Sequence, residues 1–138
     1  MKNGLIVGGL AVMALGTTVH QASAQSAAGK TIWDGVYTTA QAERGKAVAS
    51  QTCAGCHSPE EWAEPGFMGG WVGEHIGGLH SRLRLTMPAN NPGFLTTQQY
   101  ADIVAYMLSL NRAPAGTTEL PATDEGLRAI AVTKRAGR

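Results

Sequence analysis

Two cysteines and a histidine stand together in the sequence Cys53-Ala54-Gly55-Cys56-His57. Two thiols three positions apart can add across the two vinyl groups of a porphyrin, while the adjacent imidazole reaches the iron from one face. The motif therefore predicts covalently attached haem c, with thioether bonds to Cys53 and Cys56 and with His57 as an iron ligand. A disulfide between the two cysteines is the simplest alternative.

Two other uses of a Cys-x-x-Cys motif do not fit the rest of the chain. A zinc ribbon needs a second pair of ligands, and the sequence holds only two cysteines. A thioredoxin-type redox site belongs in a βαβ pattern, which the sequence lacks. Because the motif occurs once, we expect a single haem.

The amino terminus has the features of a secretory signal peptide. Lys2 supplies a positive charge, residues 5–15 are apolar with small side chains, and Ala22-Ser23-Ala24 has the small-x-small form of a cleavage site. We therefore expect residues 1–24 to be removed, which leaves a soluble protein in the periplasm. The apolar stretch is shorter than the roughly 20 residues of a spanning helix, but an uncleaved anchor is the alternative.

The composition of the mature chain argues against some partners. From residue 25 onward it has ten basic and ten acidic side chains, so the polypeptide is nearly neutral before a cofactor is counted. Basic stripes and interleaved aromatic and basic residues are absent from the sequence, which makes nucleic acid an unsuitable partner. The length fits one small domain, and a bound macrocycle would help so short a chain to form a core.

Capping signals and apolar spacing predict a small all-α domain. Thr38 with Gln41, and Thr96 with Gln99, have the spacing of capping boxes that open helices. The expected helices span residues 38–52, 74–85 and 96–111. The remaining segments are expected to be an extended entry over 31–37, loops over 58–73 and 86–95, and a tail over 115–138 that wraps the surface.

The order of these features resembles that of the class I c-type cytochromes. A helix with small residues is followed by Cys-x-x-Cys-His, a variable middle, a Met-Pro loop and a terminal helix with an aromatic residue. More narrowly, four segments are similar to those of bacterial periplasmic monohaem cytochromes, some of which are associated with quinoprotein (PQQ-dependent) dehydrogenases. These segments are residues 33–38, 86–88 with 92–93, 100–106 and 114–116.

The resemblance implies the class I cytochrome c fold, in which small helices wrap around one haem and an extended carboxyl-terminal tail follows. It divides the chain into four parts. These are a signal peptide (1–24), an extended segment (25–37), a cytochrome c domain (38–112) and a tail (113–138).

The resemblance also implies a methionine as the sixth iron ligand. Met87 lies in a Thr-Met-Pro turn between two expected helices, and Pro88 and Pro92 stiffen this loop. We therefore expect Met87 to be the second metal ligand. The alternatives are Met68, in the loop after the cysteine motif, and the histidines His75 and His80.

Further contacts with the haem are expected from the middle of the chain. In many relatives the second ring nitrogen of the ligating histidine donates to a proline carbonyl, for which Pro65 is the first candidate and Pro59 the second. Indole and guanidinium donors suit the haem propionates. We expect this role for Trp71, with Arg82 and Arg84 as alternatives.

Gly45 is expected to mark a close crossing of the first and last helices. Glycine inside a helix costs about 1 kcal/mol relative to alanine, so its presence needs a reason. In the family, a notch such as that of Gly45 and Ala49 receives the aromatic of the terminal helix, which corresponds here to Tyr106, one turn after Ile103.

The sequence therefore predicts a periplasmic electron-transfer protein rather than an enzyme. His/Met-ligated iron has no open site for substrate and transfers one electron between partners. The resemblance implies a dehydrogenase or another redox protein as the donor, and another cytochrome or a terminal oxidase as the acceptor. A peroxidase-like haem enzyme and a ligand-binding or sensing cytochrome with an open sixth site are the alternatives.

Overall fold

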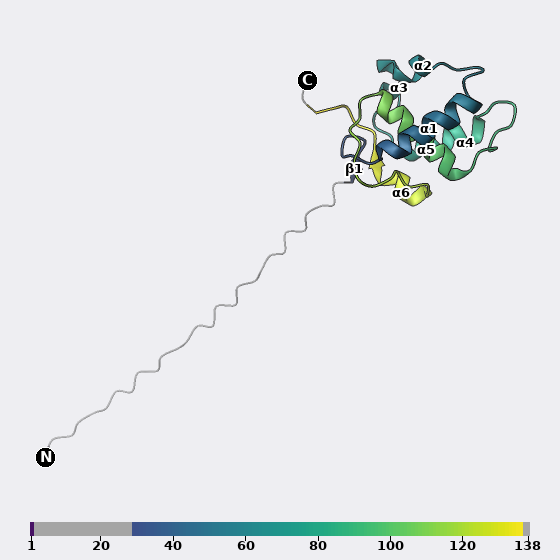
Figure 1. Ribbon diagram of the computed structural model, residues 1–138. Helices are drawn as coiled ribbons and strands as arrows, with labels where there is room; N and C mark the ends of the chain where they lie inside the picture. Colours follow the sequence, from purple (N-terminus) through teal and green to yellow (C-terminus); the bar gives the residue numbers. More distant parts are fainter. Residues whose placement is uncertain (2–28, 137–138) are drawn as a thin grey trace.

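The computed structural model describes Met1 and residues 29–136, so the expected signal peptide lies, apart from Met1, outside the described residues. The strands are β1 (Lys30–Thr31) and β2 (Ile130–Ala131), and the helices are α1 (Thr39–Thr52), α2 (Pro59–Ala63), α3 (Pro65–Gly69), α4 (Ile76–Thr86), α5 (Thr97–Leu110) and α6 (Asp124–Arg128) (Figure 1). The expected all-α class is confirmed. No helix of this described part is both long and apolar enough to cross a membrane.

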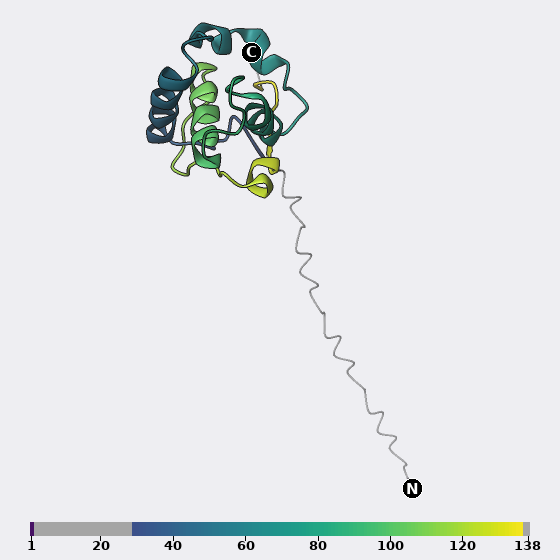
Figure 2. The ribbon, with the colours of Figure 1, turned by 90° about the vertical axis from the view of Figure 1, so that its right-hand side faces the viewer.

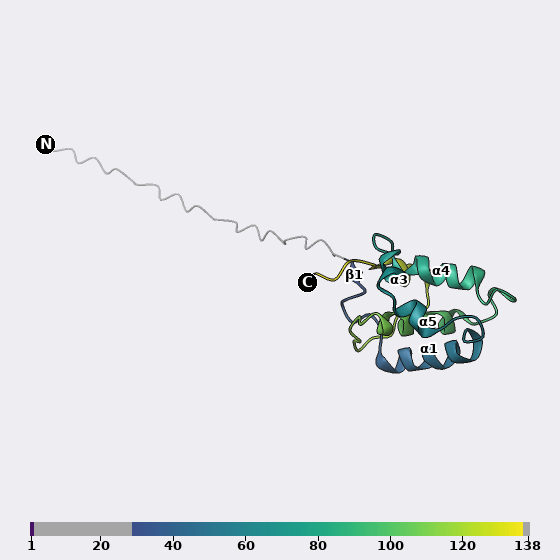
Figure 3. The same cartoon turned by 90° about the horizontal axis from the view of Figure 1, so that it is seen from above.

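Helix α5 lies between α1 and α4, as Figures 2 and 3 show from two directions. Residues 100–108 of this helix are all buried. Its predicted capping box forms, because Thr96 Oγ1 accepts from the Gln99 N–H at 3.1 Å and the Gln99 side chain accepts from the Thr96 N–H at 2.9 Å. A helix that is buried on every side is a core element. The other helices are therefore positioned against α5.

Helix α1 crosses α5 at Gly45. A Cβ on Gly45 would overlap the carbonyl oxygen of Asp102 and lie 2.9 Å from the backbone nitrogen of Ile103. The close crossing expected at Gly45 is therefore present, and the α5 backbone occupies the space of the missing side chain. Tyr106 lies one turn further along α5, where it borders a small pocket together with Ala49.

The segment 58–73 was expected to be one loop. It contains the short helices α2 and α3. Helix α2 begins at Pro59 after the N-cap Ser58, and α3 begins at Pro65. Proline suits the first position of a helix because an N–H is not needed there. Ser58 and Glu61 form a capping box, a sequence signal that the loop interpretation overlooked.

The carboxyl-terminal tail is extended after α5 and then becomes part of the core. Its strand β2 pairs in parallel with β1, with Ile130 opposite Lys30. Four apolar side chains of the tail that are larger than alanine are buried, namely Leu120, Leu127, Ile130 and Val132. The tail was expected to wrap the surface, and the structure adds that these side chains and α6 anchor it among the helices.

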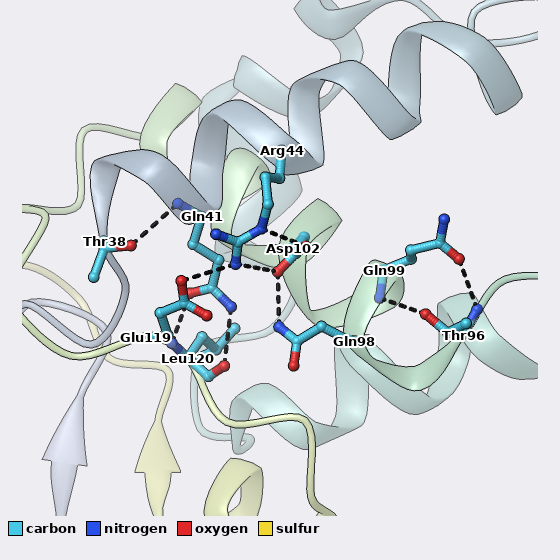
Figure 4. Close-up of polar contacts among 9 residues, drawn as sticks. All are labelled: Thr38, Gln41, Arg44, Thr96, Gln98, Gln99, Asp102, Glu119 and Leu120. Carbon is cyan, nitrogen blue, oxygen red and sulfur yellow. Dashed lines mark hydrogen bonds and ion pairs between the residues drawn. The ribbon is translucent and has the colours of Figure 1, made fainter.

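A polar cluster joins α1, α5 and the tail (Figure 4). Arg44 donates to the two carboxylate oxygens of Asp102 at 3.1 and 3.2 Å, and to Glu119 at 2.9 Å. The Gln41 Nε2 donates to the Leu120 carbonyl at 3.0 Å, and the Gln41 Oε1 accepts from the Leu120 N–H at 2.6 Å. The Gln41 amide thus pairs with one backbone unit of the tail.

This pairing changes the expected cap of α1. Thr38 Oγ1 accepts from the Gln41 N–H at 3.1 Å, so half of the predicted capping box forms. The other half would need the Gln41 side chain to return to Thr38. That side chain binds Leu120 instead, because a buried backbone unit needs its hydrogen bonds more than an exposed helix end does.

Replacing Gln41 with leucine is expected to destabilise the protein by detaching the tail from α1. The leucine leaves a buried N–H and a buried carbonyl of Leu120 without partners, at about 1–3 kcal/mol for each unpaired group. We expect a lower midpoint of urea unfolding. Gln51→Leu, on the same helix but exposed, is the control, and equal midpoints for the two variants would show that the tail does not depend on Gln41.

Candidate haem site

A cavity of about 670 Å³ opens among the end of α1, the α2–α3 segment, α4 with the loop after it, and α5. Its volume lies within the range of about 300–1,000 Å³ that is usual for ligand and cofactor pockets. Much of its wall is apolar or aromatic, with side chains of Trp62, Phe67, Leu79, Leu83, Leu95, Tyr100, Ile103 and Met107. Such a wall suits a large, flat and mostly apolar molecule.

The end of α1 brings both thiols to this cavity. Cys53 is the C-cap of α1, and its N–H donates to the Ala49 carbonyl at 2.8 Å. The Cys53 carbonyl then accepts from the N–H groups of Cys56 and His57, at 3.0 and 2.9 Å, so the motif is wound into a turn. Cys53 and Cys56 both line the cavity and are free thiols. Burial raises the pKa of the Cys53 thiol.

His57 also lines the cavity, and its ring is held by neighbours that come from α2. The Nδ1 atom lies 3.1 Å from Glu61 Oε2, and the ring centroid lies 5.9 Å from that of Trp62. The hydrogen bond with the His57 side chain, followed by that from the Ser58 N–H, lowers the pKa of the Glu61 carboxyl. A carboxylate at this position orients the imidazole.

Met87 lines the cavity from the end of α4. Its N–H donates to the Leu83 carbonyl at 2.8 Å, and its carbonyl accepts from the Tyr100 hydroxyl at 2.6 Å. Tyr100 is buried in α5, so the core helix directly fixes the backbone that carries the thioether. His57 follows α1 and Met87 ends α4, and these two helices lie on opposite sides of α5 (Figures 2 and 3).

Trp71 and Arg82, two of the three candidates for propionate contacts, line the cavity. Trp71 is half-buried, and its ring packs against Gly78 of α4. Arg84, the third candidate, is not among the described residues that line the cavity.

The remaining candidates lie outside the cavity wall of the described structure. Pro65 is exposed at the start of α3, and Met68 is buried in the core. His75 is the N-cap of α4. His80 is fully buried, its Nε2 lies 3.2 Å from the Thr97 carbonyl, and burial lowers its pKa. Six of the candidates therefore line one cavity, namely Cys53, Cys56, His57, Trp71, Arg82 and Met87. Five others lie outside its wall, namely Pro59, Pro65, Met68, His75 and His80.

Two residues of the site were not predicted from the sequence. Glu61 could have been found, because it closes the capping-box pattern that begins at Ser58 and stands four residues after His57. Tyr100 falls in the resembling segment 100–106, but nothing in that segment predicts its role. The hydrogen bond from the Tyr100 hydroxyl to the Met87 carbonyl joins residues 13 positions apart, so no local sequence pattern predicts it.

The donor set fits a haem. Two free thiols can form thioether bonds, an imidazole and a thioether are the axial ligands found in c-type cytochromes, and the cavity that joins them has apolar walls. Within the described residues, no cluster of three or more His, Cys, Asp or Glu side chains is placed to hold a bare metal ion.

One family model matches the chain, over residues 40–107, and it is described as cytochrome C oxidase, cbb3-type, subunit III. The matched span begins in α1 and ends in α5, so it includes the cysteine motif, the Met87 loop and most of the cavity wall. No curated protein and no solved structure matches the chain.

Proposed function

The chain belongs to the class I c-type cytochromes, and from that premise we propose that it is a periplasmic one-electron carrier with a single haem c. Cys53 and Cys56 hold the haem through thioether bonds, and His57 and Met87 ligate the iron. Trp71 contacts a propionate. The family is one of haem-binding electron-transfer proteins, and this assignment of residues is our own.

One observation carries the proposal. The two cysteines, His57 and Met87 are distributed over 35 positions of the sequence, and all four line the same apolar cavity. A disulfide would need only the local cysteine motif. A methionine at the wall of the same cavity adds a soft ligand for haem iron.

Each part of this site has a task in electron transfer. When bound, the haem supplies an iron that cycles between the ferrous and ferric states. The turn after α1 keeps His57 next to Cys56, and the Tyr100 hydroxyl holds the backbone of Met87. Side chains held in this way would limit the reorganisation that accompanies a change in the charge of a bound iron. The apolar walls exclude water, which tunes the potential.

The proposed place of the protein in the cell rests on the signal pattern, and its proposed partners rest on the family resemblance. The signal pattern of residues 1–24 directs the chain to the periplasm, where haem can be attached. A dehydrogenase, of which the PQQ-dependent type is one example, donates the electron. Another cytochrome or a terminal oxidase accepts it. Such transient redox complexes use small interfaces.

The intact mass of the exported protein tests this proposal. We expect the full chain, expressed with the haem-attachment machinery, to appear in the periplasm with the mass of residues 25–138 plus one haem. The pigment should stay on the protein in acidified acetone, since thioether bonds are covalent. Cys53→Ser combined with Cys56→Ser is the control, and it should lose the covalent pigment.

Two outcomes would contradict the proposal in different ways. A bare chain, or haem that acidified acetone extracts from the protein, would exclude a c-type cytochrome function. A haem-bearing protein that keeps residues 1–24 would leave electron transfer in place but would make this segment an anchor.

A further inference from the structure

Both carboxylate oxygens of Glu61 form hydrogen bonds, one with the His57 ring and one with the backbone of the next residue. Its Oε2 lies 3.1 Å from His57 Nδ1, and its Oε1 accepts from the Ser58 N–H at 3.2 Å. An ionised carboxylate has no proton to give, so Nδ1 must be the donor in the first contact. In a neutral imidazole this leaves Nε2 with the lone pair that a metal ligand needs.

The helix that carries Glu61 is tied to the core. The next residue, Trp62, is buried and packs edge-on against Tyr106, with ring centroids 6.4 Å apart. Asn111, the C-cap of α5, donates from Nδ2 to the Trp62 carbonyl at 2.7 Å. Helix α2 is therefore fixed on α5 by packing and by a hydrogen bond, and Glu61 is held in reach of His57.

We propose that Glu61 is a positioning residue for the haem ligand: it fixes the tautomer and orientation of His57, strengthens the imidazole as a donor to iron, and so favours the ferric state. This inference rests on the proposed function, in which His57 ligates the iron. A carboxylate partner makes a ligating imidazole a stronger electron donor than a neutral carbonyl does, because its negative charge attracts the shared Nδ1 proton. The reduction potential is therefore lower than it would be with a proline carbonyl as the partner.

The structure favours Glu61 over the proline that the family resemblance implies. Among the described residues, Glu61 is the hydrogen-bond partner of the His57 ring, whereas Pro65 lies at the exposed start of α3, outside the cavity wall. The Glu61 side chain is 53% exposed. Solvent screens such a contact, so it adds little to stability, and a variant at this position should fold.

Glu61→Gln tests whether the carboxylate itself, rather than the shape of the side chain, orients His57. Glutamine has nearly the same size, but its amide has one acceptor oxygen where the carboxylate has two. The one amide oxygen replaces the two oxygens that separately contact His57 and the Ser58 N–H, and the side chain carries no negative charge. Glu64→Gln is the matched control, since it removes the same charge from an exposed position three residues further along.

The test is the reduction potential of the purified haem protein at neutral pH, for the original chain and both variants. We expect Glu61→Gln to shift the ferric–ferrous equilibrium toward the ferrous form about tenfold, which is ~59 mV for one electron. Glu64→Gln should shift it much less, because a screened charge without a direct contact acts weakly.

Equal shifts in the two variants, or no shift in either, would overturn the role of Glu61 while the haem stays in place. A pyridine haemochrome spectrum of the original chain, recorded first, separates this result from a failure of the proposed function. A chain without covalent haem would overturn both proposals at once.

Discussion

Replacing Met87 with alanine is expected to open the sixth coordination position and to lower the reduction potential on the order of 100 mV or more, within the roughly 0.8 V that axial ligation spans. The thioether favours the ferrous state, and alanine offers the iron no donor, so water or a nearby base would take its place. Two measurements check this: the potential itself, and the ferrous spectrum before and after carbon monoxide is added. Carbon monoxide should bind the variant and leave the original chain unchanged.

Met68→Ala is the matched control for this prediction. Met68 is buried in the core and lies outside the cavity wall, so its loss should lower stability but leave the potential and the carbon monoxide response nearly unchanged. If Met68→Ala, and not Met87→Ala, lowered the potential and allowed carbon monoxide to bind, Met68 would be the iron ligand. Binding of carbon monoxide by the original chain would instead favour a sensing cytochrome or a haem enzyme with an open sixth site.

Replacing Gly45 with alanine is expected to disrupt the crossing of α1 and α5. The added Cβ would overlap the Asp102 carbonyl oxygen, which belongs to the backbone of a buried helix and cannot rotate away as a side chain can. Overpacking of this kind typically costs about 1–3 kcal/mol and occasionally more. We expect a cost of about 3 kcal/mol or more, and a melting temperature lower by roughly 10 °C, measured by circular dichroism.

Gly69→Ala, in helix α3, is the control because a Cβ there meets nothing within 4 Å. Alanine has the higher helix propensity, so this variant should melt at the same temperature as the original chain or slightly above it. If Gly45→Ala melted at an unchanged temperature as well, the two helices could not cross as closely as they do in this structure.

The sequence by itself determines the features that depend on short spacings. The Cys-x-x-Cys-His motif predicts its own chemistry, because two thiols and an imidazole within five positions need no fold to bring them together. The capping signals likewise predict α1 and α5 nearly to the residue, since a helix end is satisfied by side chains three positions away. Gly45 predicts a close crossing of two helices, because the cost of glycine inside a helix needs a compensating contact.

The short helices were the hardest elements to predict. Helices α2, α3 and α6 each have five residues, too few for an apolar period to show. The Ser58-to-Glu61 spacing was available, but prolines and glycines around it favoured a loop. Apolar and polar residues do not alternate regularly along the tail, so the sequence could not distinguish its four large buried side chains from exposed ones.

Only the tertiary structure decides the contacts between distant residues. Gln41 has the spacing of a capping residue, yet it binds Leu120, which lies 79 positions away. The Tyr100 hydroxyl holds the Met87 backbone, and Asn111 holds α2 against α5. In each case a buried polar group must find a partner wherever the fold brings one near. A local pattern can indicate that a polar group needs a hydrogen-bond partner. Which residue becomes that partner depends on how the helices pack.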